Sequence, residues 1–88
     1  MPETAQHRVK RLYMRSIRRG IKEMDLILSA FASARLDQMD DARLTLYDAM
    51  LNENDHDLYQ WVTGQVAVPE PYGALIADIQ DHIAQPGG

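Results

Sequence analysis

The 88-residue sequence contains no cysteine. This absence excludes disulfide bonds, thiolate nucleophiles and cysteine-ligated zinc or iron–sulfur sites. No apolar run approaches the roughly 20 residues that a membrane-spanning helix needs. The N-terminus also lacks the continuous apolar stretch of a secretory signal. His7, His56 and His82 fall on different predicted elements without a second ligand at metal-type spacing. We interpret them as surface residues and expect no metal site.

The sequence also lacks a recognisable catalytic pattern. Ser16, Ser29 and Ser33 have no neighbouring base, and the glycines form neither a phosphate-binding loop nor a nucleophile elbow. The adjacent Asp40 and Asp41 are better explained as a helix cap. Because a chain of this size encloses a substrate pocket poorly, the sequence favours a binding module over an enzyme.

Charge is distributed unevenly along the chain, whose net charge is −4. Residues 1–22 hold seven of the nine Lys and Arg residues and one acid, which gives a net charge of +6. Residues 23–88 hold two basic residues and twelve acids, which gives −10. This split favours a basic face for a partner that is acidic or presents carbonyl groups. The alternative is that the basic segment pairs with the acidic remainder of the same fold, and both interpretations stay open.

Hydrophobic spacing predicts an all-α protein, a single-domain five-helix bundle over residues 1–88, with flexible ends at residues 1–4 and 86–88. The helices are expected at about residues 5–18, 22–35, 41–51 and 57–63, and from the turn at Pro69 and Pro71 to Ile83. Asp40 is the expected N-cap of the third helix, and Asn54 or Asp55 that of the fourth. The predicted buried residues are Val9, Leu12, Tyr13, Ile17, Met24, Ile27, Leu28, Phe31, Leu44, Tyr47, Met50, Leu51, Leu58, Trp61, Val62, Tyr72, Leu75, Ile76, Ile79 and Ile83.

The stretch from Arg18 to Asp25 is the corner between the first two predicted helices. Arg18 and Arg19 are expected to close the first helix, and Gly20 to end it with a positive φ. Glu23 and Asp25 then lie in the first turns of the second helix, where the helix dipole favours carboxylates. The corner is explained either by capping alone or as a binding surface.

A helix, a glycine-containing turn and a second helix also outline a helix-turn-helix motif. The basic residues, however, lie on the first helix of the pair, whereas the second helix should face the bases. Glu23 and Asp25 occupy its N-terminal end, and the acidic remainder of the chain would repel phosphate. A nucleic-acid-binding regulator that uses the basic first helix is therefore the alternative to a protein-binding function.

Two blocks of the sequence resemble a known family. Arg19-Gly20-Ile21-Lys22-Glu23 is similar to the Arg-Gly-x-x-Glu signature of the succinate dehydrogenase assembly factors that promote flavin attachment. Asp57 to Gly64 is similar to that family's second block, acidic-Leu-aromatic-x-Trp-x-x-Gly. The resemblance extends over about residues 8–83. It implies a small helical chaperone, not an enzyme, in the bacterial cytoplasm or the mitochondrial matrix.

The resemblance also implies a partner, the flavoprotein subunit of succinate dehydrogenase and, in bacteria, often that of fumarate reductase. The chain would assist covalent bonding of FAD to a histidine of that subunit, so that FAD belongs to the partner and no cofactor is held stably here. We expect a monomer when free, no nucleic acid and no membrane insertion. A direct flavinyl transferase with Glu23 as acid or base is a third interpretation. The motif gives Arg19, Gly20 and Glu23 as partner-binding residues, and their neighbours on the corner and first helix add Arg11, Arg15, Arg18 and Asp25.

Overall fold

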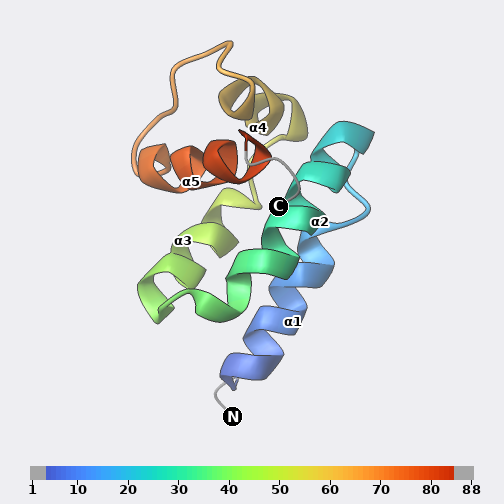
Figure 1. Ribbon diagram of the computed structural model, residues 1–88, viewed down its shortest axis with the longest axis vertical. Helices are drawn as coiled ribbons and strands as arrows, with labels where there is room; N and C mark the ends of the chain where they lie inside the picture. Colours follow the sequence, from blue (N-terminus) through green and yellow to red (C-terminus); the bar gives the residue numbers. More distant parts are fainter. Residues whose placement is uncertain (1–3, 85–88) are drawn as a thin grey trace.

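The computed structural model describes residues 4–84, which fold into five α-helices and one short 3-10 helix (Figure 1). Their bounds are α1 Ala5–Ser16, α2 Lys22–Arg35, η1 Leu36–Gln38, α3 Asp41–Met50, α4 Asp55–Val62 and α5 Gly73–Ala84. Residues 4–84 contain no strand, so the prediction of an all-α fold with five helices is confirmed. Residues 1–3 and 86–88, which we expected to be flexible, lie outside the described residues.

Side-chain caps begin three of the helices. Thr4, Asp40 and Asn54 each accept a hydrogen bond from a backbone N–H of the first turn, at 3.1, 2.8 and 2.8 Å. Each cap satisfies a donor that has no partner within its own helix. The expected cap at Asp40 is confirmed. The cap at Asn54 starts α4 at Asp55, two residues before the predicted Asp57.

The first three helices pack side by side. α1 and α2 form an antiparallel pair joined by the corner (Figure 1), and ion pairs of Arg11 and Arg15 with Asp48 join α1 to α3. α3 runs in the same direction as α1, because Arg8 pairs with Asp41 near the N-terminal ends and Arg15 pairs with Asp48 near the C-terminal ends. α4 and α5 pack on each other and on α2. The corner therefore lies at the end of the molecule where α4 begins.

One hydrophobic core lies where these helices meet. Trp61 is buried in it, as the sequence favoured, and its ring stacks on Tyr72 with centroids 6.0 Å apart. Ile83 was expected in the buried stripe of α5 but is exposed, because it borders a groove between α2 and α4 that no described helix covers. The fully buried apolar side chains are Leu12, Met24, Leu28, Phe31, Leu36, Tyr47, Met50, Leu58, Leu75, Ile76 and Ile79.

A buried polar pair joins α1 to α3. Ser16 is fully buried although it lay outside the predicted stripe, and its hydroxyl donates to the carbonyl of Leu12 at 2.8 Å. The same hydroxyl oxygen lies 2.6 Å from the Tyr47 hydroxyl. Burial raises the pKa of Tyr47 to about 12, while the hydrogen bond to Ser16 and the charge of Arg19 act in the opposite direction. Because both hydroxyls have partners, the core accommodates them without an unsatisfied polar group.

The connection between α4 and α5 is a proline-containing loop. Gly64 follows the end of α4 with φ at +79°, a conformation typical of a glycine just past a helix end. Pro69 and Pro71 were expected in the first turn of α5 but precede it. They form a turn closed by a 3.0 Å hydrogen bond from the Tyr72 N–H to the Pro69 carbonyl, with a cis Glu70–Pro71 bond. Within residues 4–84, no helix has the length and apolar character needed to cross a bilayer.

Candidate partner-binding site

The corner between α1 and α2 comprises the turn at residues 17–21 and the first turn of α2, and the turn differs from its prediction in backbone shape. α1 ends at Ser16, so Arg18 and Arg19 lie beyond the helix that they were expected to close. Arg18 rather than Gly20 adopts the left-handed conformation, with φ at +57°. This conformation costs a non-glycine residue about 1 kcal/mol. The prediction that Gly20 supplies a positive φ is therefore wrong, and the glycine serves another purpose.

Asp55, the first residue of α4, holds the corner. Its Oδ1 accepts a hydrogen bond from Nε of Arg19 at 2.8 Å, and its Oδ2 accepts one from the Gly20 N–H at 2.7 Å. The same guanidinium donates to the carbonyl of Arg15 at 2.9 Å and to that of Leu51 at 3.2 Å. Arg19 thus joins the C-terminal ends of α1 and α3 to the start of α4. Its side chain is only 12% exposed and that of Asp55 only 18%.

Gly20 accommodates a close approach by Asp55. A Cβ atom at this position would lie 3.1 Å from Oδ2 of Asp55, closer than an ordinary van der Waals contact. Asp55 cannot readily retreat, since its other oxygen is held by Arg19. A side chain at Gly20 would therefore push on Asp55 and disturb its ion pair with Arg19. This close contact, and not a positive φ, explains the glycine.

The three arginines of α1 form a row that faces α3, and they are Arg8, Arg11 and Arg15. The interpretation that the basic segment pairs with the acidic remainder of the chain is confirmed for this row. Each arginine keeps part of its surface exposed, so the partner-binding role expected of Arg11 and Arg15 stays a prediction. The contacts are Arg8 with Asp41 and Thr45, Arg11 with Asp48, and Arg15 with Asp48 and Asn52.

Other charged residues of the corner are accessible. Arg18, Lys22 and Glu23 are exposed and Asp25 is partly so, and none of the four makes an ion pair within residues 4–84. Glu23 lies in the first turn of α2, where the helix dipole favours a carboxylate. The Arg-Gly-x-x-Glu motif therefore divides into two parts. Arg19 and Gly20 fasten the corner from within, whereas Glu23 lies at its surface.

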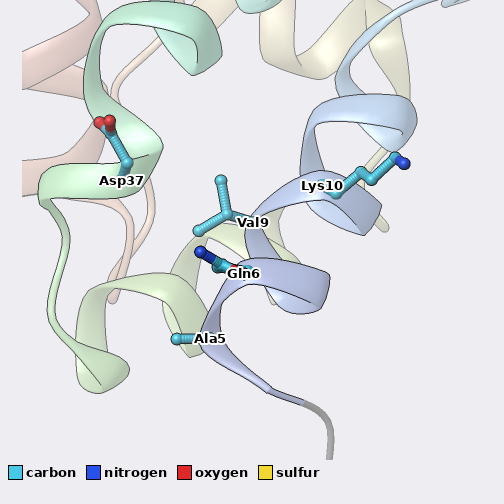
Figure 2. A pocket seen from close by; sticks show the side chains of 5 residues that line it. All are labelled: Ala5, Gln6, Val9, Lys10 and Asp37. Atoms are coloured by element: carbon cyan, nitrogen blue, oxygen red, sulfur yellow. The ribbon is translucent and has the colours of Figure 1, made fainter.

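Two hollows among the described residues lie away from this corner. One of about 290 Å³ is lined by α1 residues, by Lys10 among them, and by Asp37. Figure 2 shows Val9 pointing into the space between α1 and η1, whereas Lys10 and Asp37 point away from it. The other, of about 280 Å³, contains the Arg43–Asp78 ion pair. The first presents mainly apolar surface, whereas the second is lined mostly by polar side chains, two of which already pair with each other.

The candidate ligands named from the sequence do not converge. No group of three His, Asp or Glu side chains within residues 4–84 is placed to hold a metal ion. His82, which was interpreted as a surface residue, is partly buried, and its ring meets Phe31 edge-on with centroids 6.0 Å apart. The chemistry that the corner offers is hydrogen bonding and ion pairing through Arg18, Glu23 and Asp25.

These features define a class, a small all-α protein with one internally fastened, charged corner built on an Arg-Gly-x-x-Glu motif. A sequence profile described as flavinator of succinate dehydrogenase matches residues 10–83, which is most of the chain. The chain belongs to this family, and the resemblance inferred from its two sequence blocks is confirmed.

Three similar proteins carry the name succinate dehydrogenase assembly factor 2, mitochondrial. The chain is 46% identical to that of Meyerozyma guilliermondii over 61 residues, 69% of this chain and 45% of the relative. It is 37% identical to that of Aedes aegypti over 84 residues, 92% of this chain and 52% of the relative. It is 36% identical to that of Schizosaccharomyces japonicus over 88 residues, 98% of this chain and 62% of the relative. The chain thus spans about half the length of these curated relatives.

Asp55 is the residue of this site that the sequence did not reveal. Its position before a predicted helix indicated only a cap, and it lies 35 residues from Gly20. A buried arginine needs an acidic partner, and this need was the one signal that could have pointed to Asp55. The sequence did not give this signal, because Arg19 was expected at the end of the first helix and not beyond it. Only the three-dimensional arrangement brings the pair together.

Proposed function

We propose that this chain is an assembly factor that binds the flavoprotein subunit of succinate dehydrogenase and promotes covalent attachment of FAD to it. The observation that carries the proposal is the corner. Asp55 and Arg19 fasten its backbone to three helices, and the accessible charges of Arg18, Glu23 and Asp25 lie on this fixed support. A fixed array of charges can recognise a partner without first being ordered. Family membership supports this choice of partner.

Each residue of the motif has its own part in this proposal. Glu23 accepts hydrogen bonds from the flavoprotein, while Arg18 and Asp25 supply neighbouring charges. Arg19 and Gly20 act by holding Glu23 in place. Arg11 and Arg15 extend the same surface along α1 while remaining paired with α3.

The mechanism requires no catalytic group on this chain. A protein that binds one conformer of the flavoprotein more tightly than another shifts the population between them. A difference of about 3 kcal/mol shifts that ratio roughly a hundredfold, since each 1.4 kcal/mol is a factor of ten. In this scheme FAD and the attachment chemistry belong to the partner, and the chain acts as a monomer. Its compartment is that of the flavoprotein, the mitochondrial matrix in a eukaryote or the cytoplasm in a bacterium, where fumarate reductase is a second client.

The arginine row weighs against the alternative of a nucleic-acid-binding regulator. Arg8, Arg11 and Arg15 already face oxygen acceptors on α3, which reduces the positive charge that phosphates would meet. The exposed corner charges are mixed in sign. A mixed surface suits a protein partner better than a polyanion.

The test is covalent FAD on the succinate dehydrogenase flavoprotein, measured by in-gel fluorescence in a strain that lacks this protein. We expect the natural sequence and Glu70→Gln to restore fluorescence, and Glu23→Gln to fail. Glu70 is a matched control because it is exposed and lies in the loop before α5. Fluorescence that never depends on this protein would overturn the proposed function. Full restoration by Glu23→Gln would remove Glu23 from the site.

A further inference from the structure

A groove beside the corner collects exposed apolar side chains. Large apolar residues that are exposed within residues 4–84 are Met14, Leu26, Val66 and Ile83. Two of them, Leu26 at 62% exposure and Ile83 at 49%, line the same groove of about 480 Å³ between α2, α4 and α5. An apolar hollow of this kind on a small protein is characteristic of a contact surface.

Both sequence blocks of the family meet in this groove. Glu23 comes from the Arg19–Glu23 block, and Tyr59, Val62 and Thr63 come from the Asp57–Gly64 block. The corner gives no role to the residues of the second block that line the groove. Trp61 of that block is in the core, so the residues on either side of it are left to form the wall of the groove.

The walls of the groove are fixed. Gln80 of α5 donates hydrogen bonds to the carbonyls of Trp61 at 3.1 Å and Val62 at 3.3 Å, which ties α5 to the end of α4. The Thr63 hydroxyl donates back to the carbonyl of Tyr59 at 2.7 Å. The polar groups at this end of α4 therefore have partners within the chain, and the groove presents mainly apolar surface.

Glu23 is the only charged residue that lines the groove, and it has no ion pair within the described part of the chain. A carboxylate at the rim of an apolar hollow complements a ligand with an apolar body and a cationic neighbour. Because Glu23 also belongs to the corner, the groove and the corner form one continuous surface.

We propose that this groove is the docking site for a segment of the flavoprotein that places a large apolar side chain against Leu26 and Ile83 and a lysine or arginine against Glu23. The inference rests on the proposed function and adds the chemistry of the segment that is recognised. The second sequence block then serves to build the wall of the docking site.

The test measures binding of the purified protein to the apo-flavoprotein by biolayer interferometry. Leu26→Gln and Ile83→Gln remove apolar surface without adding charge, and Met14→Gln is the matched control because Met14 is 51% exposed on α1, outside the groove. We expect each groove variant to weaken binding about tenfold or more, from the loss of one buried apolar side chain, and the control to bind normally. Glu23→Gln should weaken binding and reduce its salt dependence, whereas Leu26→Gln should keep the natural salt dependence.

A benzophenone cross-linker at position 83 identifies the segment. We expect its cross-linked flavoprotein peptide to contain a large apolar residue beside a basic one. Normal binding by both groove variants would overturn this inference while leaving the proposed function intact. Failure of the natural protein to bind the flavoprotein would overturn both. A dimer of the free protein that Leu26→Gln converts to monomers, measured by light scattering, would assign the groove to a second copy and also overturn the inference.

Discussion

Asp55 joins the corner to the start of α4. Both of its oxygens accept hydrogen bonds, one from a guanidinium and one from a backbone N–H. Charged groups that are largely removed from water depend on such partners, because desolvation is repaid only by well-formed contacts. Arg18 lies two residues before Gly20, in the turn that Asp55 contacts, and adopts the left-handed conformation.

We predict that Asp55→Asn destabilises the fold by about 2 kcal/mol, because Arg19 keeps its charge and loses its counter-ion. Urea unfolding followed by far-UV circular dichroism measures this loss. Asp57→Asn is the matched control, since Asp57 lies in the same first turn but is exposed, and its change should stay within about 0.5 kcal/mol. Equal losses in the two variants would show that the effect is one of the α4 dipole rather than of the ion pair.

The same residues show what the sequence could predict about the site. Glu23 was identified from its motif, and the structure leaves it accessible. The motif also named Arg19 and Gly20 but could not show that they are fastened to α4. That role depends on a contact across 35 residues, and neither helix propensity nor hydrophobic spacing carries information about such a contact.

At the level of helices, the bounds of α2 agree with the prediction at both ends, Lys22 and Arg35. Its apolar spacing is regular, with Met24, Leu28 and Phe31 buried on one face. The end of α1 and the start of α4 were misplaced by two residues each. These two ends are the ones joined through Arg19 and Asp55, so a long-range contact decides where each helix stops or starts.

The pairing of α1 with α3 is also a property of whole helices. We predict that Asp48→Ala lowers the free energy of unfolding by about 1 kcal/mol, because Asp48 pairs with both Arg11 and Arg15. The natural protein should lose stability between 50 and 500 mM salt, and Asp48→Ala should lose less, since salt screens partly exposed ion pairs. Urea titrations at both salt concentrations test this. Asp81→Ala, which removes an exposed acid without an ion pair in residues 4–84, should keep the natural salt dependence.

For the molecule as a whole, the ionisation of Tyr47 couples stability to alkaline pH. The pKa of Tyr47 is raised from its ordinary value of 10.0 to about 12 in the folded state, principally by burial. Below pH 10 both states keep the phenol neutral, and its contribution to stability is complete. Between pH 10 and 12 the unfolded chain releases the proton while the folded protein retains it, so stability falls as pH rises.

We predict a loss of about 2 kcal/mol from this residue across that range, at roughly 1.4 kcal/mol per pH unit. The measurement compares the free energy of unfolding of the natural protein and Tyr47→Phe from pH 8 to pH 11.5. The natural protein should lose stability more steeply above pH 10, and the gap between the two should close or reverse. Parallel curves would mean that Tyr47 releases its proton equally easily in the folded and unfolded states.

The attachment of Gly20 to Asp55 also has a consequence during biosynthesis. Residues 19–23 leave the ribosome well before residue 55, so a nascent chain carries the full Arg-Gly-x-x-Glu motif before it has the residue that fastens it. Until α4 has been made and docked, Arg19 lacks its counter-ion and the corner lacks its fixed backbone. Unfinished or truncated chains therefore contain the motif without the contacts that hold its backbone.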